Sequence, residues 1–404
     1  MRPFNRATER RLSPVLERLL TQECGPDSRI SFEELTQAVS TLSQLFTTDR
    51  TSLPDDYLDD PLLAAAYRAY FMPVNLAKIQ ALLDELPAEA AHDRDLVKPM
   101  TVLDLGSGPG TGALACVDWM AARGNRGVRV LSVDRSKTAG QDTRRLWEAY
   151  GRIAVVHSAI LEQFEADLEK PHKGPVWNRI REAAPYDLII MTNCLNELFA
   201  EWEDPLVRRA ALVTEALHLL HPHGTVMIIE PALRPMTREL HRIRDELLRQ
   251  QACTIYSPCL HEQACPALVR PDDWCHEERP WIPHAWIQSI DREVGFIKDA
   301  LKFSYLLLRK DGRTVVQRKP DVFRVVSELR ELKGEKRAWL CNELGRTEVG
   351  RLDRLASPHN TAVDDWHRGA IVQIEKIVRK ERGGKVSAVG RIERDAAVQI
   401  VRPV

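Results

Sequence analysis

The residues with the clearest capacity for chemistry are cysteines crowded into one short run. Residues 256–281 read YSPCLHEQACPALVRPDDWCHEERPW and hold Cys259, Cys265 and Cys275, three of the eight cysteines in the chain. The run lacks the paired C-x2–4-C knuckles that are typical of four-cysteine zinc sites. Thiolates are the standard ligands of iron–sulfur clusters, whose loop spacing varies. The run therefore predicts a metal site and favours an iron–sulfur cluster.

Three cysteines need a fourth ligand, and the sequence offers several. Cys341, in KRAWLCNELG, is the leading candidate because it lies in a β-rich part of the chain beyond the main sheet. Cys253 is nearer in sequence, but it falls inside a predicted strand, ACTIYS. His261 and His276 could instead complete a zinc site with the three cysteines.

A second chemical feature is the glycine-rich turn in TVLDLGSGPGTGALA. Gly106, Gly108 and Gly110 allow a tight turn and leave room for a ligand. The helix that follows offers free backbone N–H groups at its N-terminus. The spacing G-x-G-x-G, with Asp104 two residues before the first glycine, resembles class I S-adenosylmethionine-dependent methyltransferases rather than the dinucleotide pattern G-x-G-x-x-G. In that family the loop passes along the methionine part and the adenosine, and the acidic residue helps to bind the amino-acid end.

Two later strand ends support a nucleotide site. VLSVD ends at Asp134, whose carboxylate could accept both ribose hydroxyls and would reject a 2′-phosphate. The segment TNCLNELF ends the fourth strand, which faces the methyl group in methyltransferases. Asn193 is therefore a candidate cofactor ligand, and Asn193 and Asn196 are candidate catalytic residues. Cys194 is expected to be a small buried residue rather than a nucleophile, and no general base is identifiable.

These residues fall in a strand–helix alternation between Val97 and Pro231. This alternation predicts a parallel sheet covered by helices on both faces, with ligands beyond the C-terminal ends of its strands. The apolar runs that predict strands lie at 101–105, 128–134, 152–157, 186–192 and 224–230.

The flanking parts differ from this core. The N-terminal part shows helical spacing, and its aromatic stretch AYRAYFMPVN is expected to pack in a core without legible chemistry. Strands are predicted at 252–257 and 301–310, and the alternating patterns beyond them predict a small β-rich domain. The predicted division is a helical N-terminal region at 1–95, a methyltransferase domain at 96–312 with a cysteine-rich insertion at 253–281, and a basic β-rich domain at 313–404.

Charge is uneven although the net charge is −1. From Leu301 onward the chain holds 23 Lys/Arg and 14 Asp/Glu, whereas the first 300 residues hold 34 and 44. A basic C-terminal part predicts a polyanionic partner such as RNA, the alternative being a solvated surface with no partner. No apolar run approaches the roughly 20 residues that span a bilayer, and the N-terminus lacks the apolar core of a secretory signal. We therefore expect no membrane contact and a cytoplasmic protein with reduced thiols; no oligomeric state is predicted.

Several strings, in order, are similar to a methyltransferase-like family that associates with the small ribosomal subunit. Its members are mitochondrial assembly factors in eukaryotes, with bacterial relatives. The resemblance covers roughly residues 10 to 370, and the cysteine run is its most specific part. The strings are YLDDPLLAAAYRAYFMPVNLAKI, VLDLGSGPGTG, CLNEL, IIEPA, SPCLHEQACP, DDWCH and KFSYLLLRK.

The resemblance implies a doubly wound, mostly parallel seven-stranded methyltransferase sheet that binds S-adenosylmethionine. It also implies a 4Fe-4S cluster on Cys259, Cys265, Cys275 and, most plausibly, Cys341, and binding to small-subunit rRNA. A eukaryotic member would lie in the mitochondrial matrix. Three functions stay open: an active rRNA methyltransferase, a non-catalytic assembly factor with the cofactor as a structural ligand, and a zinc-stabilised methyltransferase of small molecules.

Overall fold

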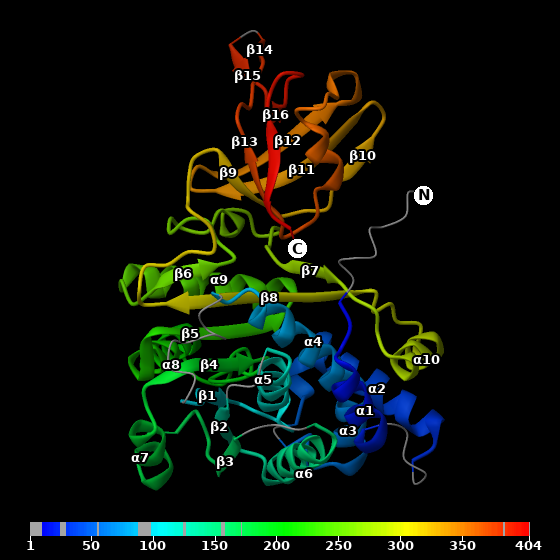
Figure 1. The fold of residues 1–404 in the computed structure, drawn as a ribbon, viewed down its shortest axis with the longest axis vertical. Coiled ribbons are helices and arrows are strands. Elements are labelled where there is room, and N and C mark those ends of the chain that lie inside the picture. Colours follow the sequence, from blue (N-terminus) through cyan, green and yellow to red (C-terminus); the bar gives the residue numbers. More distant parts are fainter. Residues whose placement is uncertain are drawn as a thin grey trace.

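Two β-sheets organise the chain, a larger one from the middle of the sequence and a smaller one from its C-terminal part (Figure 1). The computed structural model describes residues 10–24, 30–54, 56–87, 98–123, 127–154, 158–170, 172–382 and 384–403. In Figure 1 the smaller sheet lies above the larger one. The prediction of an α/β core followed by a β-rich part is confirmed.

The larger sheet is mostly parallel. Its strands follow the order β3-β2-β1-β4-β5-β8-β6, and β7 pairs with β8 outside that path. β1 to β5 run parallel, whereas β8 runs antiparallel to both β5 and β6. The predicted seven-stranded, doubly wound sheet is confirmed, with β7 as an additional strand. The strands are β1 (Met100–Leu105), β2 (Val128–Asp134), β3 (Ala159–Glu165), β4 (Tyr186–Thr192), β5 (Leu220–Pro231), β6 (Thr254–Ser257), β7 (Glu277–Pro280) and β8 (Ala300–Arg309).

Helices cover both faces because successive strand residues point into two separate apolar cores. In β1, Val102 belongs to one core and Leu103 to the other. The first core also contains side chains of α1 (Pro14–Glu23), α2 (Phe32–Thr47), α4 (Met72–Leu83), α5 (Thr111–Ala121), α6 (Lys137–Ile153) and α10 (Ala285–Val294). The second contains those of α7 (Pro175–Glu182), α8 (Pro205–Leu219) and α9 (Arg234–Arg249). None of the described helices is both long and apolar enough to cross a membrane.

The helical N-terminal region is confirmed. α2 begins at Phe32, because Ser31 and Glu34 form a capping box in which Oγ of Ser31 accepts from N of Glu34. α3 (Pro61–Ala66) and a π-helical segment (Tyr67–Phe71) lead directly into α4. These helices share an apolar core with the larger sheet, and the division of the chain at 95/96 and 312/313 stays a prediction.

One predicted strand is misplaced. The prediction of a strand at 152–157 is wrong at its beginning, because α6 continues to Ile153. Residues 155–157 lie outside the described residues. The strand β3 begins at Ala159 instead. It lies at the sheet edge and carries polar side chains such as Glu162, which pairs with Arg179 at 2.8 Å. An edge strand needs fewer apolar residues than a central one, so the more apolar segment before it was the misleading signal.

The smaller sheet has its own apolar core. Its strand order is β16-β12-β11-β9-β13-β17, with β10 paired to β11. The strands are β9 (Val322–Val325), β10 (Arg330–Leu332), β11 (Glu335–Asn342), β12 (Gly345–Leu352), β13 (Ile371–Ile374), β16 (Val389–Arg391) and β17 (Val398–Arg402); β14 (Glu381–Arg382) and β15 (Lys385–Val386) pair separately.

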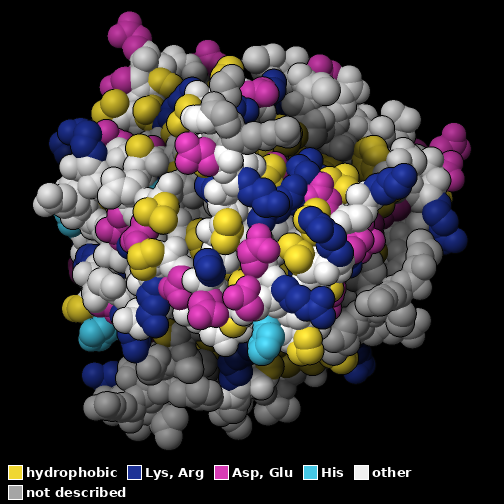
Figure 2. Space-filling view, turned by 90° about the horizontal axis from the view of Figure 1, so that it is seen from above, with side chains coloured by type: hydrophobic (Ala, Val, Ile, Leu, Met, Phe, Trp, Pro, Cys, Tyr) yellow, Lys and Arg dark blue, Asp and Glu magenta, His cyan; other side chains and the backbone are white. Residues whose placement is uncertain are grey.

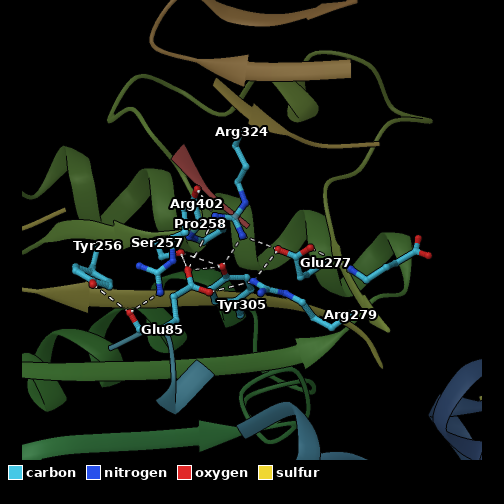
Figure 3. A network of polar contacts seen from close by, with 10 residues as sticks. Glu85, Tyr256, Ser257, Pro258, Glu277, Arg279, Tyr305, Arg324 and Arg402 are labelled. Atoms are coloured by element: carbon cyan, nitrogen blue, oxygen red, sulfur yellow. Dashed lines mark hydrogen bonds and ion pairs between the residues drawn. The ribbon is translucent and has the colours of Figure 1, made fainter. Parts of the chain in front are cut away.

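A buried ionic network joins the two sheets and the N-terminal helices (Figure 3). Glu85, just after α4, accepts from Tyr305 of β8 at 2.9 Å and pairs with Arg279 of β7 at 3.0 Å. Arg324 of β9 donates to Tyr305 at 2.8 Å and pairs with Glu277 at 2.6 Å. Burial raises the pKa of Glu85, but Arg279 and Arg324 outweigh burial, and the pKa falls to about 2. The network therefore holds a charged carboxylate where the sheets meet.

We predict that Glu85→Gln lowers the free energy of unfolding by about 3 kcal/mol at neutral pH, because it leaves the guanidinium groups of Arg279 and Arg324 to share the carboxylate of Glu277. The pKa of Glu85 is depressed on folding, so its contribution is present above the unfolded pKa of 4.5 and is lost as the pH falls toward about 2. Urea unfolding at several pH values measures this.

The matched control is Glu343→Gln, at an exposed turn position, which should change stability by less than about 0.5 kcal/mol. Equal effects of the two substitutions at neutral pH would contradict the role given to the network.

Candidate functional site

A cavity of about 430 Å³ lies at the C-terminal ends of the parallel strands. It is bounded by the turn after β1, the end of β2, the segments after β4 and β5, and the N-terminal helices. This is the edge at which ligands of such sheets bind. Of the sequence-predicted cofactor residues, Asp104, Gly106, Gly108, Asp134 and Asn193 line it.

The glycine turn adopts a backbone that side chains rarely allow. Gly106 and Gly108 have φ values of +69° and +52°. A Cβ on Gly106 would lie 2.5 Å from the Cβ of Cys194, whereas one on Gly108 would meet no atom within 4 Å. Because Gly108 lines the cavity, a side chain there would occupy ligand space. Gly110, with φ of +86°, is the residue that precedes α5.

Two carboxyl groups, those of Asp104 and Asp134, line the cavity beside the glycine turn. Asp134 accepts from the backbone N–H groups of Gly108 and Ser136 at 2.7 and 2.9 Å. Asp104 is only 2% exposed, and its Oδ2 has no hydrogen-bond partner among the residues that the structure describes. Burial, followed by the nearby charge of Asp134, raises the pKa of Asp104 to about 7. A ligand that brings a hydrogen-bond donor or a positive charge to Oδ2 would satisfy this carboxyl group.

The segment after β4 places both predicted asparagines at the cavity, but their situations differ. Asn193 lines it with a left-handed backbone of φ +54°. Asn196 is engaged at both ends of its amide, because Nδ2 donates to Glu230 and Oδ1 accepts from Arg50. Burial raises the pKa of Glu230 to about 8. Each end of the Asn196 amide therefore already has a protein partner.

Cys194 is not poised as a nucleophile. Its thiol lies 3.2 Å from the carbonyl oxygen of Leu105, to which it can donate, and burial raises its pKa well above the ordinary value. Since the thiolate is the reactive form, the structure agrees with the expectation of a packing residue.

Sequence reasoning missed the contribution of the N-terminal helices to this cavity. Tyr67, Phe71, Asn75 and Lys78 line it, and their three- and four-residue spacing puts them on one helical face. The stretch AYRAYFMPVN thus does more than pack in a core. A usable signal is the pair of polar residues, Asn75 and Lys78, within a helix whose other residues are buried.

The four candidate metal ligands lie around one small cavity. Cys259, Cys265 and Cys275 come from the loop between β6 and β7, and Cys341 comes from β11. His261 also lines this cavity, with its Nε2 3.7 Å from Sγ of Cys341. Within the described residues, no group of three His, Cys, Asp or Glu side chains is already arranged to hold a metal ion.

The alternative ligands are placed differently. Cys253 lines a separate surface pocket. His276 lies beside the cysteine cavity, and its Nε2 is 2.8 Å from Oε1 of Glu278. Of the alternatives considered from the sequence, His261 is the one that lines the same cavity as Cys341.

The thiols lie close enough to interact electrostatically. Burial raises the pKa of Cys341 well above its ordinary value, and the other three cysteines raise it further. Beneath them is Arg244, which is fully buried and donates to the carbonyl oxygens of His261 and Gln263 at 2.7 and 2.9 Å. Burial lowers the pKa of Arg244, but Cys259, Asp245 and Cys265 outweigh that effect and raise it. The positive charge of Arg244 would stabilise the negative charge of thiolate ligands.

Contacts outside the run hold the cysteine loop. Arg238 of α9 donates to the carbonyl oxygens of Ala267, Arg270 and Asp273 at 2.6 to 2.9 Å. Arg346 of β12 pairs with the carboxylate of Asp273 at 2.5 Å. The loop is thus fixed to the larger sheet on one side and to the smaller sheet on the other.

Comparisons with known proteins agree with this architecture. The model of the family described as mitochondrial small ribosomal subunit Rsm22 matches residues 61–350. Comparison with curated proteins gives no match.

Three solved structures are similar to the chain at low identity. The CcbJ methyltransferase from Streptomyces caelestis is 20% identical with a TM-score of 0.26, over 39% of this chain and 52% of that chain. The magnesium protoporphyrin IX methyltransferase ChlM from Synechocystis PCC 6803, with bound SAM, is 12% identical with a TM-score of 0.32, over 67% and 97%. The plantazolicin methyltransferase BamL, in complex with a triazolic desmethylPZN analog and SAH, is 12% identical with a TM-score of 0.36, over 68% and 98%.

We predict that Asp104→Asn stabilises the ligand-free protein above neutral pH, because it removes a buried carboxylate with one unpartnered oxygen. Folding raises the pKa of Asp104 from 3.8 to about 7, so the wild type loses stability as the pH rises through that interval and the variant does not. Thermal unfolding at about pH 5 and about pH 8 measures the difference.

The exposed Asp353→Asn serves as control and should leave the pH dependence unchanged. A variant at position 104 that is less stable than the wild type at the higher pH would show that the carboxylate is satisfied.

Proposed function

The chain belongs to the family of the mitochondrial small ribosomal subunit protein Rsm22, and from that premise we propose that it binds S-adenosylmethionine and a 4Fe-4S cluster while acting on the small ribosomal subunit. The observation that carries the proposal is the convergence of four cysteines from two sheets on one cavity, in a chain whose larger sheet has a separate glycine-lined cavity.

The cofactor proposal is supported by the polar groups of the larger cavity. Asp134, at the end of β2, would accept the ribose hydroxyls, and Asp104 would receive the amino-acid end of the cofactor at its unpartnered Oδ2. Gly108 leaves room for the ligand. When bound, S-adenosylmethionine supplies a methyl group on a sulfonium sulfur; Asn193 lines the cavity near the segment that would face it.

Two observations favour a cofactor-binding factor over an rRNA methyltransferase. Asn196 is occupied by Arg50 and Glu230, and the thiol of Cys194 is protonated and directed at a backbone carbonyl. Neither residue is therefore ready to activate an acceptor. Alignment alone can accelerate a displacement on the sulfonium methyl, so direct methyl transfer is the second candidate function.

The metal proposal is supported by the donor set. Cys259, Cys265, Cys275 and Cys341 would hold the group, which would then bridge the two sheets covalently. A thiolate set above the buried Arg244 suits an iron–sulfur cluster. His261, beside Cys341, supports zinc as the alternative ion to test.

The partner proposal concerns small-subunit rRNA. The surplus of Lys and Arg in the C-terminal part supports contacts with phosphates. Figure 2, which views the molecule from the side of the smaller sheet, shows Lys and Arg side chains among Asp and Glu rather than gathered in one patch. Such a distribution favours phosphate contacts that are spread over this face rather than gathered in one basic patch.

We predict that anaerobically purified protein contains iron and acid-labile sulfide, and that Cys341→Ser loses most of both because one of four thiolate ligands is removed. Metal and sulfide analysis with visible absorption measures the loss. Cys253→Ser is the matched control, since Cys253 lies near the run in sequence but lines another pocket, and it should retain the metal. If the wild type contains zinc and no acid-labile sulfide, the bound group is a zinc ion and the cluster assignment is wrong.

We also predict that the wild type binds S-adenosylmethionine, whereas Gly108→Val weakens binding more than tenfold because the side chain enters ligand space. Gly312→Val is the control for backbone strain, because Gly312 also has positive φ, at +73°, and open space around it. Calorimetric titration measures both.

Incubation with labelled cofactor and immature small subunits then separates the two candidate functions. Normal binding without methyl incorporation is the expected outcome. Incorporation that disappears in Gly108→Val would instead establish an rRNA methyltransferase.

A further inference from the structure

Lys78 is a partly buried cation in the glycine-lined cavity, and the proposed function leaves it without a role. It belongs to α4, and its side chain lines the same cavity as Asp104 and Gly106. Its Nζ donates to Oδ1 of Asn75 at 3.0 Å. That partner is a neutral amide and does not compensate the charge of an ammonium group.

The surroundings of Lys78 are unfavourable to its charge. Burial is the largest effect and lowers its pKa to about 7; Lys298 lowers it further, while Glu230 acts in the opposite direction. A buried ammonium group is costly unless an anion meets it. Since Lys78 faces a cavity, a bound ligand could supply that anion.

The other two lysines of the cavity differ from Lys78. Lys302 is largely exposed, with its Nζ 3.9 Å from the Glu278 carboxylate. Lys298 has its ammonium group 5.7 Å from the ring centre of Tyr70; burial lowers its pKa, and the carboxylate of Asp291 opposes that effect only in part. Lys78 differs from both in that its hydrogen-bond partner is a neutral amide, whereas Lys298 and Lys302 each have a carboxylate nearby.

The polar groups of the cavity match the amino-acid end of the proposed cofactor. That end carries an ammonium group and a carboxylate. The unpartnered Oδ2 of Asp104 suits the ammonium group, which leaves the carboxylate to be neutralised. We propose, on the basis of the proposed function, that Lys78 binds the carboxylate of the methionine moiety of S-adenosylmethionine, so that α4 completes the cofactor site.

This assignment gives the N-terminal helices a binding role. The glycine turn, Asp104 and Asp134 all belong to the strand–loop framework of the larger sheet, whereas Lys78 comes from a helix that precedes it in the chain. At the end of α4, Glu85 is held in the buried network between the sheets. The position of Lys78 at the cavity is therefore set by the same contacts that join the sheets.

The test compares two ligands that differ in the amino-acid end. S-adenosylhomocysteine carries the carboxylate, whereas 5′-methylthioadenosine lacks both the ammonium group and the carboxylate. Lys78→Gln should weaken binding of S-adenosylhomocysteine by roughly 10- to 100-fold, the usual range for a hydrogen bond to a charged group. It should change binding of 5′-methylthioadenosine by less than about twofold, which also shows that the variant is folded. Lys333→Gln, at an exposed turn position, should change neither.

The outcomes separate this inference from the function it rests on. If the wild type binds neither ligand, the proposed cofactor function fails. If the wild type binds S-adenosylhomocysteine and Lys78→Gln loses both ligands equally or neither, the cofactor function stands and the role of Lys78 is overturned. If Lys78→Gln weakens binding of an RNA oligonucleotide while S-adenosylhomocysteine binds normally, the oxyanion is a phosphate of the acceptor and the assignment to the cofactor is likewise overturned.

Discussion

The constraint on which the structure depends is the burial of charge between its two sheets. Glu85, Glu277, Arg279 and Arg324 are all withdrawn from water at that boundary, where an unpaired charge would cost several kcal/mol. Apart from the pair of Arg279 and Glu277 within β7, these groups are paired with partners from other elements, so the complete network forms when Glu85, β7, β8 and β9 meet in one arrangement. Specific pairing of this kind favours one relative position of the sheets, whereas apolar contact alone would tolerate several.

The cysteine loop follows from that constraint. Its residues lie between β6 and β7, and β7 carries Glu277 of the network. The loop has little regular structure, and its backbone is held by Arg238, Arg244 and Arg346, which reach it from α9 and β12. The thiols therefore reach one cavity through contacts made by arginines far away in sequence, together with the pairing of β11 that positions Cys341.

Much of the fold could be predicted because its signals are local. The apolar runs of β2 and β4 match the observed strands, and Ser31 marks the start of α2. The edge strand β3 was misplaced because its polar side chains are stabilised by ion pairs rather than by burial. The candidate site was predictable where chemistry coincides with a strand end, as at Asp104 and Asp134. Lys78 was not, because its role depends on how α4 packs over the sheet.

The hydrogen-bond partners of the cavity side chains explain why a ligand is easier to assign to this cavity than a reaction. Binding requires groups that are left unsatisfied in the free protein, and Asp104 has such an atom. Catalysis would require groups free to act on an acceptor, yet Asn196 and Cys194 are already engaged within the protein. A ligand that meets Asp104 would use this unpaired atom, whereas an acceptor beside Asn196 or Cys194 would meet side chains that already have partners. Such a ligand would stabilise the packing of the N-terminal helices against the sheet, a contribution that does not depend on methyl transfer.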